Sequence, residues 1–113
     1  MPRGYTPDRG DLAWLEFNPH AGHERAGRRP PLVVSPGAYN RRVGLALYCP
    51  VTSQVKDYPF EVALPLGLAV GGVVLADQVK SLDWRVREAE FAVRLPDNTS
   101  AEIVGKLAAL LEE

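Results

Sequence analysis

The sequence predicts a mainly β fold, a small β-barrel with one C-terminal α-helix that covers one side. Short apolar runs recur along the chain between turn-forming residues, and ten glycines and ten prolines are scattered among them. After residue 99, in contrast, the apolar side chains recur at the spacing of a helix. The length of 113 residues fits one domain of about 100 to 150 residues, so we expect a single domain over residues 1–113.

The first half of the chain contains three strand patterns. Residues 11–17 alternate imperfectly, with apolar side chains on both faces, as expected for a strand in a small closed sheet. Residues 32–35 predict a second strand that ends at Pro36, and residues 44–51 a third, after a turn or one helical turn. Residues 18–31 hold three prolines and two glycines without periodicity, which predicts a long exposed loop.

Three further strand patterns lie in the second half. Residues 60–64 and 73–77 are short β-branched or alternating runs bounded by prolines and glycines. Residues 84–95 alternate apolar with charged side chains, which predicts a strand with one solvated face. The polar segment 52–59 is expected to connect two strands.

The C-terminal helix is predicted from its start signal and its apolar stripe. Thr99 and Glu102 have the spacing of a capping box, in which the threonine side chain accepts from a free helix N–H and the glutamate returns the bond. About three helical turns follow. The stripe comprises Ile103, Val104, Leu107, Leu110 and Leu111.

Composition indicates an ordinary globular protein with an uneven charge distribution. Hydrophobic residues make up 46% and charged residues 24%, which excludes the disordered class. A net charge of −1 and a pI near 6.1 give no overall basic excess of the kind common in nucleic-acid-binding proteins. Arginines are nevertheless concentrated between residues 25 and 42, so a local basic surface is expected.

Cysteine usage and the apolar runs bear on the cellular compartment. The single cysteine, Cys49, cannot form an internal disulfide and lies in the apolar run 45–51, where we expect it to be buried. Residues 1–10 lack the apolar core of a signal peptide, and the run 67–76 is far shorter than the roughly 20 residues of a membrane helix. We therefore expect a cytoplasmic protein that does not enter a membrane.

Two positions stand out as candidates for chemistry on a phosphate. The sequence lacks a nucleophile elbow, a P-loop, a dinucleotide fingerprint and a paired-cysteine metal site. Arg29 is permanently charged and its forked guanidinium matches a phosphate, although an ordinary ion pair at the entry of a strand is an equal alternative. The hydroxyl of Thr52 can bind a phosphate oxygen, or it can cap a turn.

Histidines and a glutamate in the 18–31 loop are weaker candidates. His23 and Glu24 can transfer protons if their pKa values suit the task, but a solvated pair is the simpler interpretation. His20, His23 and Glu24 match no familiar zinc spacing, so we expect no metal. Trp14 and Trp84 are expected in the core or an interface rather than stacked on nucleic-acid bases.

Taken in order, these segments resemble the MazF/PemK family of toxins from toxin-antitoxin systems. The resemblance spans most of residues 5–85. Its most specific part is a first strand that ends in Asn-Pro, followed by a glycine-rich loop that ends in Gly27-Arg28-Arg29-Pro30. The other matching segments are YTPDRGDLAWLEFNP, CPVTSQ, YPFEV and VVLADQVKSLDWR.

The resemblance implies an SH3-like barrel of the CcdB/MazF/PemK type with a C-terminal helix. It also implies a homodimeric, sequence-specific and metal-independent endoribonuclease (an mRNA interferase) that cleaves single-stranded RNA, needs no cofactor and is inhibited by a cognate MazE-like antitoxin. By motif match, Arg29 and Thr52 are the central catalytic pair, Glu24 supports them, and His23 and Asp77 are possible accessory residues. The implied RNA-binding surface comprises Arg25, Arg28, Ser53, Gln54 and Lys56, with Arg87 beside it.

Cleavage of this kind proceeds by attack of a ribose 2′-hydroxyl on the adjacent phosphate, giving a 2′,3′-cyclic phosphate and a free 5′-hydroxyl. It needs a base, an acid and donors for the charge on the phosphate. Arg29 suits the last task and can also serve as the acid by donating a shared proton, but it is a poor base because the pKa of an arginine side chain stays above roughly 12. Glu24 or His23 suits the base, and Thr52 the orientation of the phosphate. Two other classes stay open: a non-enzymatic toxin of the same fold that binds a protein such as gyrase, as CcdB does, and an inert RNA- or antitoxin-binding module.

Overall fold

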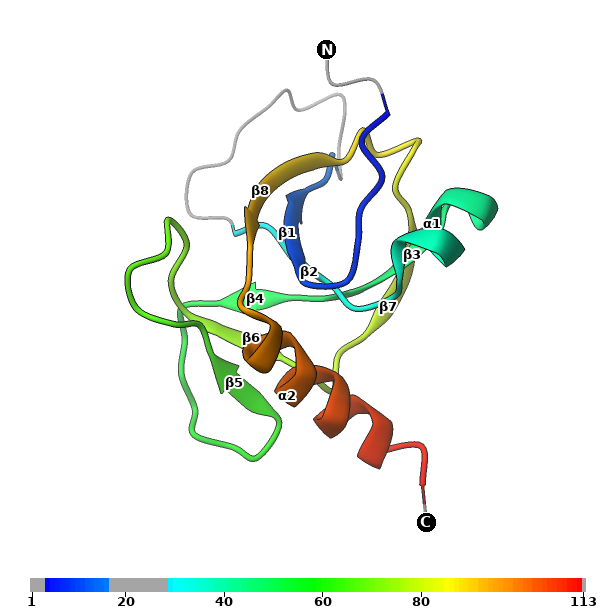
Figure 1. Cartoon of the computed structure of the whole chain (residues 1–113). Helices are drawn as coiled ribbons and strands as arrows, with labels where there is room; N and C mark the ends of the chain where they lie inside the picture. The colour runs from blue at the N-terminus through cyan, green and yellow to red at the C-terminus, as the bar shows by residue number, and fades with distance from the viewer. Residues whose placement is uncertain (1–3, 17–28, 113) are drawn as a thin grey trace.

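A computed structural model of the chain describes residues 4–16 and 29–112, which form two antiparallel β-sheets and two helices (Figure 1). The five-stranded sheet has the order β7-β3-β2-β1-β8, with β1 (Asp11–Trp14), β2 (Leu32–Val33), β3 (Leu45–Cys49), β7 (Lys80–Asp83) and β8 (Glu90–Arg94). The three-stranded sheet has the order β4-β6-β5, with β4 (Val51–Thr52), β5 (Glu61–Ala63) and β6 (Val73–Leu75). The predicted mainly β fold with a terminal helix is confirmed.

The two sheets share one apolar core. Pro50 alone separates β3 from β4, so one continuous segment passes from the first sheet into the second. The Leu75 N–H donates to the Pro50 carbonyl at 3.0 Å and so attaches β6 to this junction. The core contains residues of both sheets and of the C-terminal helix, and each large apolar side chain buried there contributes about 1.5–3 kcal/mol. Its central members include Leu12, Leu32, Cys49, Val62, Val74 and Ile103.

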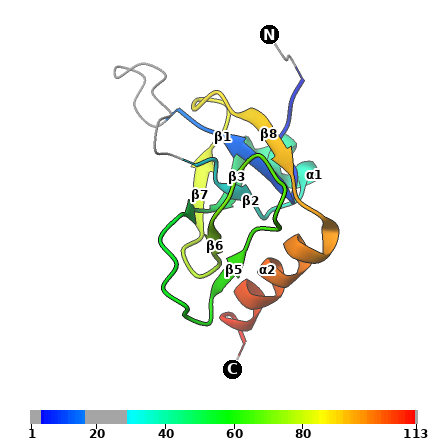
Figure 2. The ribbon, with the colours of Figure 1, turned by 90° about the vertical axis from the view of Figure 1, so that its left-hand side faces the viewer.

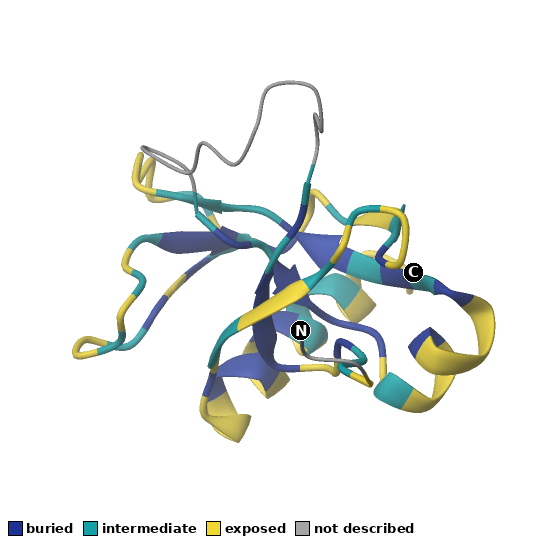
Figure 3. Ribbon diagram, turned by 90° about the horizontal axis from the view of Figure 1, so that it is seen from above, coloured by how far each residue is buried: buried dark blue, intermediate teal, exposed yellow. Residues whose placement is uncertain are grey.

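A second apolar cluster covers the other face of the five-stranded sheet. It contains Ala13, Leu15, Val33, Ala46, Tyr48 and Trp84. Burial on both faces explains the imperfect alternation of the first strand, because neither face of such a strand meets water. Figure 3 shows buried residues along most of the strands, whereas exposed residues lie in the loops, on the outer parts of the helices and along β8.

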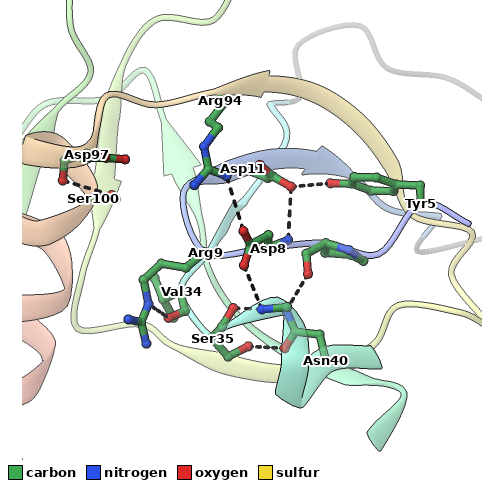
Figure 4. Close-up of polar contacts among 12 residues, drawn as sticks. Tyr5, Asp8, Arg9, Asp11, Val34, Ser35, Asn40, Arg94, Asp97 and Ser100 are labelled. Atoms are coloured by element: carbon green, nitrogen blue, oxygen red, sulfur yellow. Dashed lines mark hydrogen bonds and ion pairs between the residues drawn. The ribbon is translucent and has the colours of Figure 1, made fainter. Parts of the chain in front are cut away.

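Helix α1 (Gly37–Val43) confirms the expected helical turn after Pro36. It ends at Gly44, which has the left-handed φ of 83° that favours glycine. Asn40 is fully buried and holds the segment in place (Figure 4): its amide nitrogen donates to the carbonyls of Pro7 (2.7 Å) and Ser35 (3.0 Å). The Asn40 carbonyl accepts from the Trp84 indole at 2.9 Å. The expected burial of Trp84 is thus confirmed, whereas Trp14 is half-buried.

Helix α2 (Asp97–Ala109) lies beside β5 (Figure 2) and has about the expected length. The predicted capping box at Thr99 and Glu102 is wrong. The helix begins directly after Pro96, and the Pro96 carbonyl accepts from the N–H of Thr99 (3.1 Å), which is therefore inside the first turn. Proline suits the position before a helix because it has no N–H to satisfy.

The apolar stripe of α2 is partly confirmed. Ile103 is fully buried, and Val104 and Leu107 pack against the core. Leu110 and Leu111, however, are 47% and 83% exposed, because this end of the helix extends past the core. No described helix is long and apolar enough to cross a membrane.

The predicted strand 84–95 is wrong in its first half. Residues 84–88 form a turn, in which the Asp83 carboxylate accepts the Val86 N–H (2.9 Å) and Glu88 adopts a positive φ of 53°. The strand before this turn, β7, was not predicted, and β8 occupies the rest. The other strands lie where they were expected but are shorter than predicted, and the predicted run 44–51 is divided by Pro50 into β3 and the start of β4.

Cys49 has the predicted buried position. Its side chain is fully buried, and burial, with a smaller contribution from the charge of Asp77, raises the pKa of the thiol to about 11. Cys49 therefore serves the core as a small apolar residue.

Candidate functional site

Arg29 is positioned by one hydrogen bond to the loop between β5 and β6. Its Nε donates to the Gly71 carbonyl at 2.8 Å. Of the five N–H donors of a guanidinium, this is the only one that bonds to a described residue. The group is thus oriented through Nε, while no described residue bonds to the Nη nitrogens, which are the donors that suit an oxyanion.

Thr52 ends β4 and closes a small turn with its side chain. Its Oγ1 accepts the N–H of Gln54 at 3.1 Å. The turn-capping role considered from the sequence is therefore present. It does not exclude a second role, because an oxygen that accepts this bond keeps its own hydrogen as a donor.

Arg29 and Thr52 lie near each other, each just beyond the paired residues of β2 and β3. Leu32 pairs with Cys49 and Val33 with Tyr48. Arg29 lies three residues before Leu32, and Thr52 lies three residues after Cys49, where the chain has passed into the other sheet and Thr52 pairs with Val73. The approach of the two residues is seen at Gly72, since a Cβ there would lie within 4 Å of both the Thr52 carbonyl oxygen and Nε of Arg29. The structure thus brings together the two residues that the sequence singled out.

Gly72 makes this close approach possible. A Cβ at Gly72 would lie 2.4 Å from the Thr52 carbonyl oxygen and 3.6 Å from Nε of Arg29, and its φ is 121°. Only glycine fits such a position. From the sequence, Gly71 and Gly72 are interpreted only as turn residues that bound a strand. A glycine at the start of a strand can also mark a close approach of another backbone segment.

A cleft of about 160 Å³ opens beside Thr52. It is lined by Thr52, Gln54, Lys56, Tyr58, Glu61, Leu75 and Gln78. Two of the predicted RNA-binding residues, Gln54 and Lys56, therefore share a cleft with Thr52, whereas Ser53 is exposed and does not line it.

The wall of the cleft includes residues that sequence reasoning missed. The Glu61 carboxylate accepts the backbone N–H of Lys56 and of Asp57, both at 2.9 Å. It thereby holds Asp57 in a left-handed conformation, with φ 58°. Tyr58 and Glu61 lie in the YPFEV segment that the family resemblance quotes, which is the signal that could have drawn attention to them.

Asp77, a predicted accessory residue, contacts the wall of this cleft. The Tyr58 hydroxyl donates to Oδ1 of Asp77 at 2.7 Å. This bond raises the pKa of the Tyr58 hydroxyl, and a hydrogen bond with Gln78 acts in the opposite direction. Among the described residues, Asp77 bonds to Tyr58 and forms no ion pair with Arg29.

Several predicted residues are not part of this arrangement. His20, His23, Glu24, Arg25 and Arg28 lie outside the described residues. The Arg87 side chain donates to the Glu16 carbonyl at 3.3 Å, near the end of β1. Within residues 4–16 and 29–112, no group of three or more His, Cys, Asp or Glu side chains is placed to hold a metal ion.

Comparison with known proteins gives consistent matches. The family model described as "PemK-like, MazF-like toxin of type II toxin-antitoxin system" matches residues 8–111. The chain is 54% identical over 89 residues to the "Endoribonuclease toxin MazF" of Escherichia coli (strain K12), covering 79% of each protein. It is 35% identical over 108 residues to the Escherichia coli "Endoribonuclease PemK", covering 92% of this chain and 81% of that protein.

Solved structures agree with these relatives. A crystal structure of MazE-MazF from Deinococcus radiodurans (Form-I) superposes with a TM-score of 0.82 at 54% identity, covering 95% of this chain and 97% of the other. Crystalline MazF of the same organism (Form-I) gives a TM-score of 0.81 at 59% identity, with the same coverage.

Proposed function

Because this chain belongs to the PemK-like, MazF-like toxins of type II toxin-antitoxin systems, we propose that it cleaves single-stranded RNA at specific sequences without a metal ion. The chain is a MazF-type endoribonuclease toxin. We infer a single-stranded substrate because the base edges of an A-form helix are poorly accessible, and sequence-specific proteins usually read unstacked bases.

In the proposed reaction, the 2′-oxygen of one ribose attacks the adjacent phosphorus and the bond to the 5′-oxygen breaks. The products are a 2′,3′-cyclic phosphate and a 5′-hydroxyl. The proton of the 2′-hydroxyl passes to Glu24 or His23, and the leaving 5′-oxygen takes up a proton from solvent water or, as a shared proton, from Arg29. Because the nucleophile belongs to the RNA, the protein needs no activated serine or cysteine and no metal-bound water.

The observation that supports this scheme best is the convergence of Arg29 and Thr52 at Gly72. The Nη donors of Arg29 suit the negative charge that builds on the non-bridging phosphate oxygens. The Thr52 hydroxyl keeps a hydrogen with which to orient the same phosphate. Removing one such donor typically slows an enzyme by about 10² to 10³.

We also propose a homodimer that acts in the cytoplasm and is inhibited by a MazE-like antitoxin. Support for the antitoxin comes from the Deinococcus radiodurans relatives, whose crystal structures contain MazE with MazF. An acidic antitoxin segment that folds on binding would compete with RNA for Arg29 and Lys56.

The test is incubation of the purified protein in chelator with a mixed-sequence single-stranded RNA, with the new ends analysed by mass. We expect fragments with cyclic phosphate ends from the wild type, and a rate at least about 100-fold lower for Arg29→Ala. Arg42→Ala is a matched control, because this exposed arginine lies on α1, outside the site. A near-wild-type rate for Arg29→Ala would overturn the scheme, and intact RNA with every protein would favour a protein-targeting toxin of the same fold.

A further inference from the structure

We propose that the connection between β5 and β6 positions Arg29 for the reaction, and that Leu68 and Val70 anchor this connection in the core. The inference rests on the proposed function, because it concerns how the arginine of that site is held. It gives two apolar side chains a part in the reaction, which they exert on Arg29 through the backbone of the loop.

The connection between β5 and β6 is apolar along its whole length. Residues 63–72 have the sequence ALPLGLAVGG, which contains no polar side chain. In Figure 1 this connection projects from the three-stranded sheet. Surface loops are ordinarily polar, so an apolar loop of this length needs a structural reason.

The apolar side chains of the loop differ in what they contact. Leu66, at the tip, is fully exposed. Leu68 and Val70 are partly buried and pack against the hydrophobic core. The returning half of the loop is therefore attached to the core by side chains, whereas the tip is not.

The carbonyl that orients Arg29 depends on this attachment. Gly71 is exposed, and a Cβ there would meet nothing within 4 Å, so no side chain and no neighbouring atom restrains this residue directly. On its C-terminal side the backbone is fixed at Gly72, whose carbonyl accepts the Leu64 N–H at 2.9 Å. On its N-terminal side, the nearest restraint is the packed side chain of Val70.

Loss of the packing would let the Gly71 carbonyl move, and the guanidinium would move with it. The bond from Nε to this carbonyl is the only one that Arg29 makes to a described residue. Displacement of a catalytic group by about 1 Å can cost about 100-fold in rate. Because the Nη donors of Arg29 stabilise charge that builds in the transition state, the loss should appear in kcat more than in KM.

The test is the cleavage kinetics of Val70→Ala and Leu68→Ala on one single-stranded RNA, with kcat and KM measured separately and well below the Tm of each variant. We expect kcat to fall by at least about tenfold in both variants, with KM little changed. Leu66→Ala is the matched control, because it removes the same atoms as Leu68→Ala from the exposed tip of the same loop. It should keep the wild-type kcat, as should Leu68→Met, which preserves the packed volume.

Two further measurements separate positioning of Arg29 from a general loss of stability. In an Arg29→Ala background, Val70→Ala should leave the residual rate unchanged, because the loop acts through the arginine. In the wild type without RNA, the Nε–H of Arg29 should be protected from exchange with water, as measured by NMR. This protection should fall in Val70→Ala and Leu68→Ala but not in Leu66→Ala.

Wild-type kcat and wild-type protection in both Val70→Ala and Leu68→Ala would overturn the inference, as would an equally large loss of rate when Val70→Ala is added to Arg29→Ala. Either result leaves the endoribonuclease mechanism in place. If the wild type fails to cleave RNA while the exchange of the Arg29 Nε–H responds as expected, the proposed function is overturned and the positioning of Arg29 by the loop stands.

Discussion

Replacing Gly72 by alanine should disable the protein through the packing of its site. The added Cβ would lie 2.4 Å from the Thr52 carbonyl oxygen, where ordinary contacts begin near 3.4 Å. The obstacle is backbone, so it cannot rotate away as a side chain can. The φ of 121° adds strain, because side chains other than hydrogen disfavour this conformation.

The expected loss of stability is the sum of two costs, the strained backbone conformation and the overlap of the new Cβ with the Thr52 carbonyl. The backbone conformation costs about 1–2 kcal/mol, and the overlap costs about 1–3 kcal/mol, as for other overpacked positions. We therefore expect a loss of about 3 kcal/mol, which for a domain of this size lowers Tm by about 12 °C. Relief of the overlap also moves Thr52 relative to Arg29 by about 1 Å, and a displacement of that size costs about 100-fold in rate.

Thermal unfolding and RNA cleavage, measured on the same preparations, test this prediction. Gly71→Ala is the control, because Gly71 does not have a left-handed backbone conformation and a Cβ there meets nothing within 4 Å. The carbonyl of residue 71 remains available to Arg29 in this variant. Gly71→Ala should leave Tm and rate close to wild type. If Gly72→Ala behaves like Gly71→Ala in both measurements, the close approach of the Thr52 backbone does not determine the site as we argue.

Two further predictions concern the core. Asn40→Ala removes a buried amide that bonds to the carbonyls of Pro7 and Ser35. It should reduce the free energy of unfolding, measured in urea, by about 3 kcal/mol. A loss no larger than that caused by Asn98→Ala, at an exposed position, would contradict this prediction. For Cys49, burial raises the thiol pKa to about 11, above its ordinary value, so the stability it contributes is fully present below about pH 9 and is lost as pH rises through 11. Cys49→Ala should therefore show a shallower fall in stability over that range, and the native thiol should react with iodoacetamide only after unfolding; equal slopes or rapid labelling of the native protein would refute this.

The sequence predicts those elements whose side-chain pattern is local. The strands around Leu12, Leu32 and Val74 were recognised because their apolar runs are bounded by turn residues. The turn at 84–88 was missed because its residues alternate like a strand, whereas the turn depends on the bond from Val86 N–H to the Asp83 carboxylate. The predicted start of α2 is misplaced because Pro96 and Thr99 are both valid start signals. The Pro96 carbonyl accepts the N–H groups of Thr99 and Ser100, so the helix begins after Pro96 and Thr99 lies inside its first turn.

The site divides in a similar way. Arg29 and Thr52 could be selected from the sequence because their side chains carry the chemistry and their motifs are specific. Gly72, Tyr58 and Glu61 could not, since their roles depend on what lies opposite them in space: a carbonyl at Gly72, a carboxylate at Tyr58 and two amides at Glu61.

The pairing of Leu32 with Cys49 has a consequence for how this protein can vary. Arg29 and Thr52 are far apart in sequence, but each lies three residues beyond that pair, so the pair brings the segments that carry them together. Residues inserted or deleted in the connection between β2 and β3 leave these spacings unchanged, provided that the two strands keep their register. A single residue gained or lost between Arg29 and Leu32, in contrast, would shift the guanidinium away from the Gly71 carbonyl that orients it and so away from Thr52. We therefore expect the protein to tolerate length changes in the connection that contains α1. We expect it not to tolerate them between Arg29 and Leu32 or between Cys49 and Thr52.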